Sequence, residues 1–325
     1  MPSPTHPRLC RRRFLLLTGL APLTRARAQL IGSREEWSVR GTNPVEIFHG
    51  ERRVVSYRTG FDRGMPVFDP IVGPTGGVYT ASPEQGRKEG IDPRGGAWFS
   101  LGRVNGYGFH QAPGAPIIGM KAGRIVHRAM NGVLIKGPAI VVRTRSEWRD
   151  YDEPTHRIAS DQREVTLFYR EDGSLAMDLA LELIADAGDL EIGPEPEGAW
   201  FFRAHPGLIR KEGEKARQQN SDSELSGTTG GSGMRAKWLV CQGKEATGVT
   251  AGVAIFDHPS NPGHPAVWSV RPDGLIAANP FPDPKSPPQV VRNGESIRFR
   301  YRMIFFRDSL VGDNLTRAYE AFASR

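Results

Sequence analysis

The sequence has little cysteine and no long apolar run. It holds two cysteines in 325 residues, and Cys10 lies in an N-terminal segment expected to be removed. Cys241 would then stand alone, so we expect no internal disulfide and a fold stabilised by its hydrophobic core. No apolar run reaches the roughly 18 residues that a membrane-spanning helix needs, so no membrane span is predicted in the mature chain.

The first 28 residues have the three parts of an export signal. Arg11 to Arg13 form a basic segment, Phe14 to Leu23 an apolar run, and Ala26 to Ala28 a small-x-small cleavage site. The adjacent arginines followed by Phe and Leu favour the twin-arginine route, with the export machinery as a partner. We therefore expect a periplasmic or extracellular protein, with residues 1–28 as the signal. The mature chain, residues 29–325, is long enough for either one large β domain or two ordinary ones.

Charge gives little support to a nucleic-acid partner. The formal net charge of +7 falls to +1 once the signal is removed, because that segment contains six arginines and no acidic residue. Nucleic-acid binding needs a basic face on the mature domain, so no nucleic-acid partner is predicted. The 38 glycines and 26 prolines instead indicate many turns.

Alternating apolar residues predict long β-strands. Leu175 to Ile184 has leucine or methionine at every second position, which is typical of a strand with one buried face, although its composition also suits a helix. In the run from Ile297 to Phe305, Arg298, Arg300 and Arg302 share the face opposite the apolar residues. They either bind an anion or form a solvated outer sheet face.

A short helix is expected at the C-terminus. Asp313 or Asn314 can cap it, and Leu315, Tyr319 and Phe322 would share its buried side. Long helices between the strands are lacking, so parallel βαβ units are not expected. The predicted fold class is all-β, with this one closing helix.

The best candidate site is the segment from Asp257 to Pro265. It follows an apolar strand, and its three prolines exclude both a helix and an inner strand. Asp257, His258 and His264 are the predicted catalytic residues, because imidazoles exchange protons near neutral pH. The alternative is a stiff loop whose Asp and Asn side chains cap its own backbone amides. No metal site and no cofactor are predicted.

Two motifs resemble a known family. One joins Trp98-Phe99 to Gly102-x-Val104-Asn105-Gly106, and the other runs from Phe256 through His264-Pro265 and Trp268 to Ala278-Asn279-Pro280-Phe281. Together they resemble the bacterial PmoA-like family of unknown function, which carries a methane oxygenase label. The resemblance implies a large antiparallel β supersandwich of the galactose-mutarotase type, a fold often used for carbohydrates. Residues 29–325 would then form a single β-sandwich domain. Methane oxidation is not expected, because the mature chain lacks a membrane span.

One segment departs from that family. Its members usually carry Asp-His-Pro-His-His where this chain has Asp92-Pro93-Arg94-Gly95-Gly96, so two candidate contacts remain there, Asp92 and Arg94. Further candidate ligand contacts are Trp98, Asn105, Asn261, Trp268 and Asn279. The tryptophans could equally belong to the core, and Asn105 and Asn279 to turns.

The sequence thus predicts an exported protein that binds a carbohydrate or a related small polar ligand at the Asp257–His264 loop. Processing of that ligand by an epimerase, lyase or hydrolase activity is one form of this hypothesis. The alternative is a non-catalytic glycan-binding or structural module, which the missing histidines at residues 92–96 favour.

Overall fold

Antiparallel β-strands form most of the chain in the computed structural model. The structure describes residues 36–60, 64–82, 95–110, 119–194, 198–209, 217–222, 224–225, 231–310 and 312–325. Contacts divide the chain into Met1–Arg34 and Glu35–Arg325. The predicted signal, Asp92 and Arg94 lie outside the described residues, so those predictions stay predictions.

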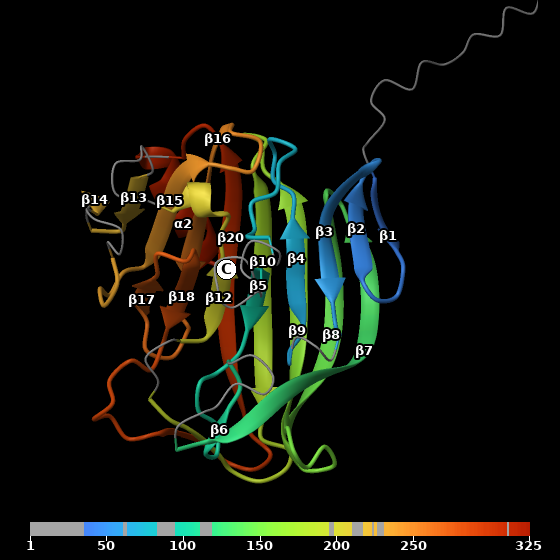
Figure 1. Cartoon of the computed structure of the whole chain (residues 1–325), viewed down its shortest axis with the longest axis vertical. Coiled ribbons are helices and arrows are strands. Elements are labelled where there is room, and N and C mark those ends of the chain that lie inside the picture. Colours follow the sequence, from blue (N-terminus) through green and yellow to red (C-terminus); the bar gives the residue numbers. More distant parts are fainter. Residues whose placement is uncertain are drawn as a thin grey trace, which may run out of the picture. The chain divides into compact units, whose positions relative to one another are not determined.

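The first large sheet has eight strands in the order β1-β2-β3-β4-β5-β12-β18-β17 among the described residues. Figure 1 shows β1 to β4 side by side. The strands are β1 (Trp37–Arg40), β2 (Val45–His49), β3 (Arg52–Arg58), β4 (Val67–Ile71), β5 (Gly96–Phe99), β12 (Trp200–Arg203), β17 (Val267–Val270) and β18 (Leu275–Asn279).

The second large sheet has ten strands in the order β14-β13-β15-β16-β20-β10-β9-β8-β7-β6, counted over the same residues. Its strands are β6 (Tyr107–Gly108), β7 (Lys121–Lys136), β8 (Ala139–Asp150), β9 (Arg157–Tyr169), β10 (Leu175–Ile184), β13 (Arg217–Asn220), β14 (Glu224–Leu225), β15 (Trp238–Lys244), β16 (Thr250–Asp257) and β20 (Ser296–Arg307). Its neighbouring strands pair antiparallel except β6 with β7, which are parallel.

Three small elements complete the described part of the chain. Strands β11 (Leu190–Ile192) and β19 (Gln289–Val291) form a two-stranded sheet. A 3-10 turn, η2 (Pro206–Leu208), follows β12, and one α-helix, α2 (Asp313–Ala323), lies near the C-terminus. None of the described helices has the length and apolar character needed to cross a membrane.

The main core lies between the two large sheets. Phe99 of β5 meets Phe299 of β20 with ring centroids 5.0 Å apart, and Trp200 of β12 stacks on Tyr301 of β20 at 6.1 Å. Every second residue of β10, from Leu175 to Leu183, is buried in this same core. The strand prediction for residues 175–184 is therefore confirmed, as is the all-β sandwich with antiparallel sheets and a short C-terminal helix.

Helix α2 covers one part of the outer face of the ten-stranded sheet. Its buried side packs against outward-facing apolar side chains of β15, β16 and β20, in a second core of Trp238, Val240, Ala254, Phe256, Ile304, Phe306, Leu310, Leu315, Ala318, Tyr319 and Phe322. The helix begins after Gly312, which makes no side-chain cap, and Asp313 is its first residue. The predicted capping by Asp313 or Asn314 is therefore wrong, whereas the predicted buried face is confirmed.

Strand β7 is longer than its apolar run suggested, and two β-bulges interrupt its pairing with β8. One lies between His127 and Ala129, and the other between Met130 and Gly132. The second leaves Asn131 as an extra residue without a partner in the register. A bulge bends a strand and redirects a side chain, which matters for the site described below.

Candidate functional site

Asp257 fastens the predicted loop to the sheet. It ends β16 and is 1% exposed. Its carboxylate accepts hydrogen bonds from Asn261 Nδ2 at 2.7 Å, His264 Nδ1 at 2.7 Å and the Ala266 amide at 2.8 Å. A buried carboxylate is stable only when donors surround it, and these three donors supply that need. Asp257 thus joins the start, middle and end of the loop.

Asn261 connects this loop to the neighbouring strand β20. Its side-chain oxygen accepts from the Arg300 amide, and its Nδ2 donates to the Arg300 carbonyl, both at 2.7 Å. The amide side chain therefore pairs with Arg300 as a further backbone strand would. This position lies 39 residues along the chain, so the loop is fixed by the tertiary structure as well as by its prolines.

His258 faces Arg300 and the end of α2. Its Nδ1 lies 2.7 Å from Ser260 Oγ and accepts from the Ser260 amide at 3.0 Å, and Arg300 Nη1 approaches its Nε2 at 3.1 Å. Its ring meets Phe322 edge-on at 5.0 Å. Burial, followed by the nearby Arg300 cation, lowers the pKa of His258 below its ordinary value of 6.5. Burial and the Arg300 cation thus favour the neutral form of the His258 ring.

His264 is the more accessible of the two predicted catalytic histidines. Its side chain is 16% exposed, while the Asp257 carboxylate bound to its Nδ1 is 1% exposed. A carboxylate on Nδ1 orients the ring so that Nε2 is the nitrogen free to exchange a proton. Arg235 fixes the adjoining backbone, because its Nη1 donates to the carbonyls of Gly263 and Pro265 at 2.9 and 2.8 Å.

The structure separates the other predicted ligand contacts from this loop network. Trp98 is 2% exposed and stacks on Phe201, and Trp268 is 1% exposed and donates from Nε1 to the Ala236 carbonyl. Asn105 has a φ of 51° and binds the backbone of Asp189 and Glu191. Asn279 is buried and accepts from the Phe281 amide. Each side chain thus has a packing or turn role, and its contact with a ligand stays a prediction.

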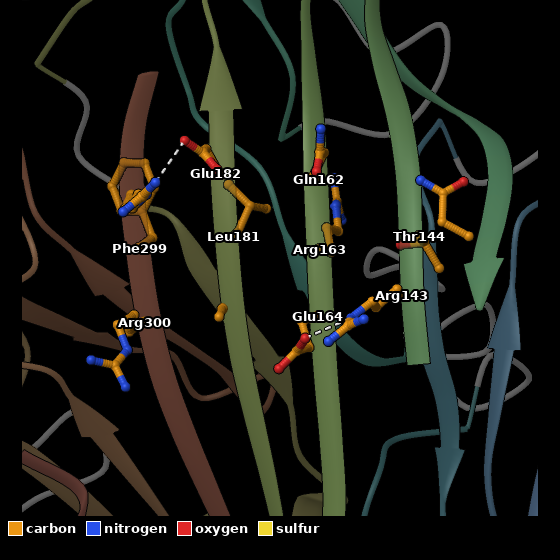
Figure 2. A pocket seen from close by; sticks show the side chains of 12 residues that line it. Arg143, Thr144, Gln162, Arg163, Glu164, Leu181, Glu182, Phe299 and Arg300 are labelled. Atoms are coloured by element: carbon orange, nitrogen blue, oxygen red, sulfur yellow. Dashed lines mark hydrogen bonds and ion pairs between the residues drawn. The ribbon is translucent and has the colours of Figure 1, made fainter. Parts of the chain in front are cut away.

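A hollow of about 410 Å³ opens on the outer face of the ten-stranded sheet, beyond the part that α2 covers. Figure 2 shows Glu164 and Arg143 on one side of it and Arg300 on the other. Strands β7, β8, β9, β10 and β20 supply its lining, which comprises Asn131, Arg143, Thr144, Gln162, Arg163, Glu164, Ala180, Leu181, Glu182, Arg298, Phe299 and Arg300.

Strand register explains why the hollow lies there. One row across the sheet runs from Arg300 through Ala180, Glu164 and Arg143 to Gly132. Ala180 has only a methyl group and Gly132 has no side chain beyond hydrogen, so both positions leave space beside the long polar side chains of this row. The bulged residue, Asn131, lies beside Gly132 and lines the same space.

Most of the charge around the hollow is paired. Arg143 Nε donates to Glu164 at 2.8 Å, and Arg298 Nη2 donates to Glu182 at 3.2 Å. A hydrogen bond from Ser296, and then Arg298, lower the pKa of Glu182, which keeps that carboxylate ionised. Arg300 differs, because no carboxylate of the described residues lies within ion-pair distance of it.

A second, smaller hollow of about 330 Å³ lies at the other side of the loop. Its lining includes Arg235 and Gly263 from the loop network and Phe281 and Asp283 from the segment after β18. The loop therefore contacts a lining residue of each hollow, Arg300 of the first and Arg235 of the second.

One group of metal-type ligands occurs in the described part of the chain, at the turn after β8. Asp150, Glu153 and His156 each offer an atom within 4.8 Å of the others. Asp150 already accepts from the amides of Asp152 and Glu153 and from the hydroxyl of Tyr107. These bonds explain the cluster as a turn, and it does not line either hollow.

Sequence reasoning missed most of the larger hollow. The alternation in β20 places Arg298 and Arg300 together, and they do line it, whereas Arg302 is buried and bidentate to Asp178 at 2.5 and 2.6 Å. Gln162, Glu164 and Glu182 could be found only through the register. Asn131 precedes Gly132, a pair that ordinarily indicates a turn rather than a bulge in a strand.

The chain can be placed in a family by comparison with known proteins. No curated protein is similar enough to it to count as a match. A family model does match, and it covers residues 44–320, which include every strand that contributes to the hollow and the whole of the loop. The protein belongs to DUF6807, a family of unknown function.

Proposed function

We propose that this protein binds a carbohydrate, or a related small polar ligand, in the hollow on the outer face of the ten-stranded sheet. The observation that carries the proposal is the small side chain of Ala180 in the hollow, surrounded by long, mostly planar polar side chains. Carboxylate, amide and guanidinium groups hold donors and acceptors in fixed planes, which suits the adjacent hydroxyls of a sugar. A volume of about 410 Å³ is large enough for a small ligand.

The Asp257–His264 loop would then form one edge of the binding region. It holds Arg300 in place through Asn261 and His258, and Arg300 lines the hollow. Binding without turnover is the favoured function, because the three donors on Asp257 and the contacts of His258 already explain why those polar residues are there.

Acid/base catalysis by His264 is a second candidate function. It is favoured by the 2.7 Å contact from Asp257 to His264 Nδ1, which orients the ring. His264→Gln would abolish turnover of any sugar that the wild type converts while leaving its affinity within about threefold, since binding groups remain. Unchanged turnover in this variant would exclude the assignment.

We also propose that the protein is exported and is related to the PmoA-like family. The basic and apolar N-terminal segment supports export to the periplasm or beyond. The quoted motifs and the pair of packed antiparallel sheets support a PmoA-like relationship and a supersandwich of the galactose-mutarotase type. The part of the outer face of the ten-stranded sheet that carries the hollow lies beyond α2, which agrees with the proposed binding.

The test is a substitution that fills the hollow without adding charge. Ala180 is exposed, so Ala180→Leu should leave the free energy of unfolding within about 0.5 kcal/mol. Ala129→Leu is the matched control, because Ala129 does not line the hollow. It ends the neighbouring row on the same face, which runs through Arg298, Glu182, Gln162 and Arg145.

Binding would be measured on an array of neutral and acidic oligosaccharides and repeated in solution by calorimetry. The wild type and Ala129→Leu should bind the same members, and Ala180→Leu should lose at least about tenfold in affinity, as expected when a group fills a ligand's space. Equal binding by all three proteins would place the ligand elsewhere. No binding by the wild type to any member would overturn the proposed function.

A further inference from the structure

We infer that the ligand of this hollow is an acidic sugar whose carboxylate or sulfate group binds to Arg300. The inference rests on the proposed function and names the class of glycan. Three outward arginines, Arg143, Arg298 and Arg300, line the hollow with two glutamates, Glu164 and Glu182. Each glutamate pairs with one arginine, which leaves one positive charge, on Arg300.

The three arginines on the outward face of β20 show what sets Arg300 apart. Arg302 is buried and bidentate to Asp178, and Arg298 is exposed and pairs with Glu182. Arg300 lies between them, half-buried, and among the described residues its side chain contacts a ring nitrogen of His258. A half-buried cation beside a neutral ring retains much of its capacity to bind an anion.

The surroundings of Arg300 favour a ligand with an acid at one end and hydroxyls at the other. Ala180 is its partner on β10 and leaves the space beside the guanidinium open. Beyond Ala180 the row continues to the Glu164 carboxylate, which can only accept hydrogen bonds, and so suits hydroxyl donors rather than an anion. The planar guanidinium fits two oxygens of a carboxylate or sulfate at once.

The loop holds the backbone of Arg300 by contacts that do not use its charge. Asn261 bonds to the amide and carbonyl of Arg300, which any residue at that position would supply. Arg300→Gln should therefore keep the loop and the sheet while removing the cation. Arg145→Gln is the matched control, because Arg145 is exposed on the outer face of β8 and does not line the hollow.

The experiment compares the wild type with Arg300→Gln, Arg300→Lys and Arg145→Gln by calorimetry. The probes are matched oligosaccharides: a glucuronate with its glucose parent, a galacturonate with its galactose parent, and a sulfated galactan fragment with its unsulfated form. We expect the wild type to prefer the acidic member of at least one pair. Arg300→Gln should weaken that binding roughly 10- to 100-fold, the value of a hydrogen bond to a charged group.

The other proteins and probes define the remaining outcomes. The neutral parent should change less than about threefold in Arg300→Gln, Arg300→Lys should bind acids with intermediate affinity, and Arg145→Gln should behave as the wild type. The carboxylate and sulfate pairs show which acid is taken. A protein whose circular dichroism matches the wild type confirms that a loss of binding is not a loss of fold.

Failure of the inference differs from failure of the proposed function. Equal affinity for neutral and acidic members, or an equal effect of Arg145→Gln and Arg300→Gln, would overturn the inference, while loss of binding in Ala180→Leu would still support a glycan in the hollow. Absence of binding to every probe by the wild type would overturn both.

Discussion

The Asp257–His264 loop and the outer-face hollow are both polar, but they use their polar groups differently. In the loop, Asp257 and Asn261 are bound on nearly every side by other groups of the protein. In the hollow, Gln162 and Asn131 are exposed, and Arg300 has no carboxylate partner among the described residues. Polar groups that satisfy one another build structure, whereas those that face open space can bind a ligand.

This difference revises the location of the proposed ligand site. The loop gathers the residue types of a catalytic centre within eight positions, from Asp257 to His264, yet most of their hydrogen bonds are internal. The side chains that line the hollow come from five strands, so no short stretch of sequence indicates it. The two regions meet at Arg300, whose backbone is bound by the loop and whose side chain lines the hollow.

The largest expected effect is the loss of stability when the loop loses the carboxylate of Asp257. Asp257→Ala would leave the donors of Asn261, His264 and Ala266 without their acceptor in a buried place. Each buried unsatisfied donor costs about 1–3 kcal/mol, so we expect the free energy of unfolding to fall by about 3–5 kcal/mol. Urea denaturation followed by tryptophan fluorescence measures this.

The control for that variant is Asp283→Ala. The Asp283 carboxylate also accepts from a backbone amide and a serine hydroxyl in a turn, but it is in an exposed segment, so its loss should cost less than about 1 kcal/mol. Similar losses of unfolding free energy in the two variants would show that the carboxylate of Asp257 does not stabilise the loop. Asp257 would then remain a candidate catalytic residue.

Acid should destabilise the loop through His258. Its pKa in the folded protein is lowered by burial and by Arg300, so the unfolded chain takes up a proton first as the pH falls. The stability that the neutral ring provides is complete above the ordinary value of 6.5, and it is lost as the pH falls from there through the folded pKa. His258→Gln should therefore flatten the decline of the free energy of unfolding in this range, measured by urea titrations at a series of pH values.

His127 is a second histidine that should contribute to the pH dependence of stability. Burial, followed by Arg163, lowers its pKa too, so His127→Gln should flatten the same part of the profile, and the double variant should be flatter than either single one. A wild type and a His258→Gln variant whose profiles run parallel would mean that the His258–Arg300 contact does not hold the ring neutral.

Much of the fold could be predicted from the sequence because strand alternation is a local signal. The leucines and Met177 between Leu175 and Leu183 show which face of β10 is buried, and the same rule orients Arg298 and Arg300 in β20. The prolines after Asp257 correctly predict a loop at the end of a strand. Burial of Leu315, Tyr319 and Phe322 follows from helical spacing in the same way.

The candidate site could not be predicted because it depends on which strands are neighbours. Ala180 lies beside Arg300 and Glu164 only because β10 pairs with both β20 and β9 in one particular register. Alternation sets the face of a side chain but not its cross-strand partner. The bonds from Asn261 to Arg300 likewise join positions 39 residues apart, and local spacing does not report them.

The smallest expected effect on stability comes from comparing two asparagines, Asn131 of the hollow and Asn261 of the loop. Asn131 is exposed in a bulge, so Asn131→Ala should change the free energy of unfolding by less than about 0.5 kcal/mol, whereas Asn261→Ala removes buried bonds and should cost about 2–3 kcal/mol. Binding should follow the opposite order for a direct contact: Asn131→Ala is expected to weaken the affinity for the bound oligosaccharide about 3- to 10-fold, the value of one neutral hydrogen bond. Calorimetry on both variants measures this, with urea denaturation to report stability. If Asn131→Ala destabilised the fold as much as Asn261→Ala did, the bulge in β7 would be a structural element, and the hollow would resemble the loop in having its polar groups committed to the fold.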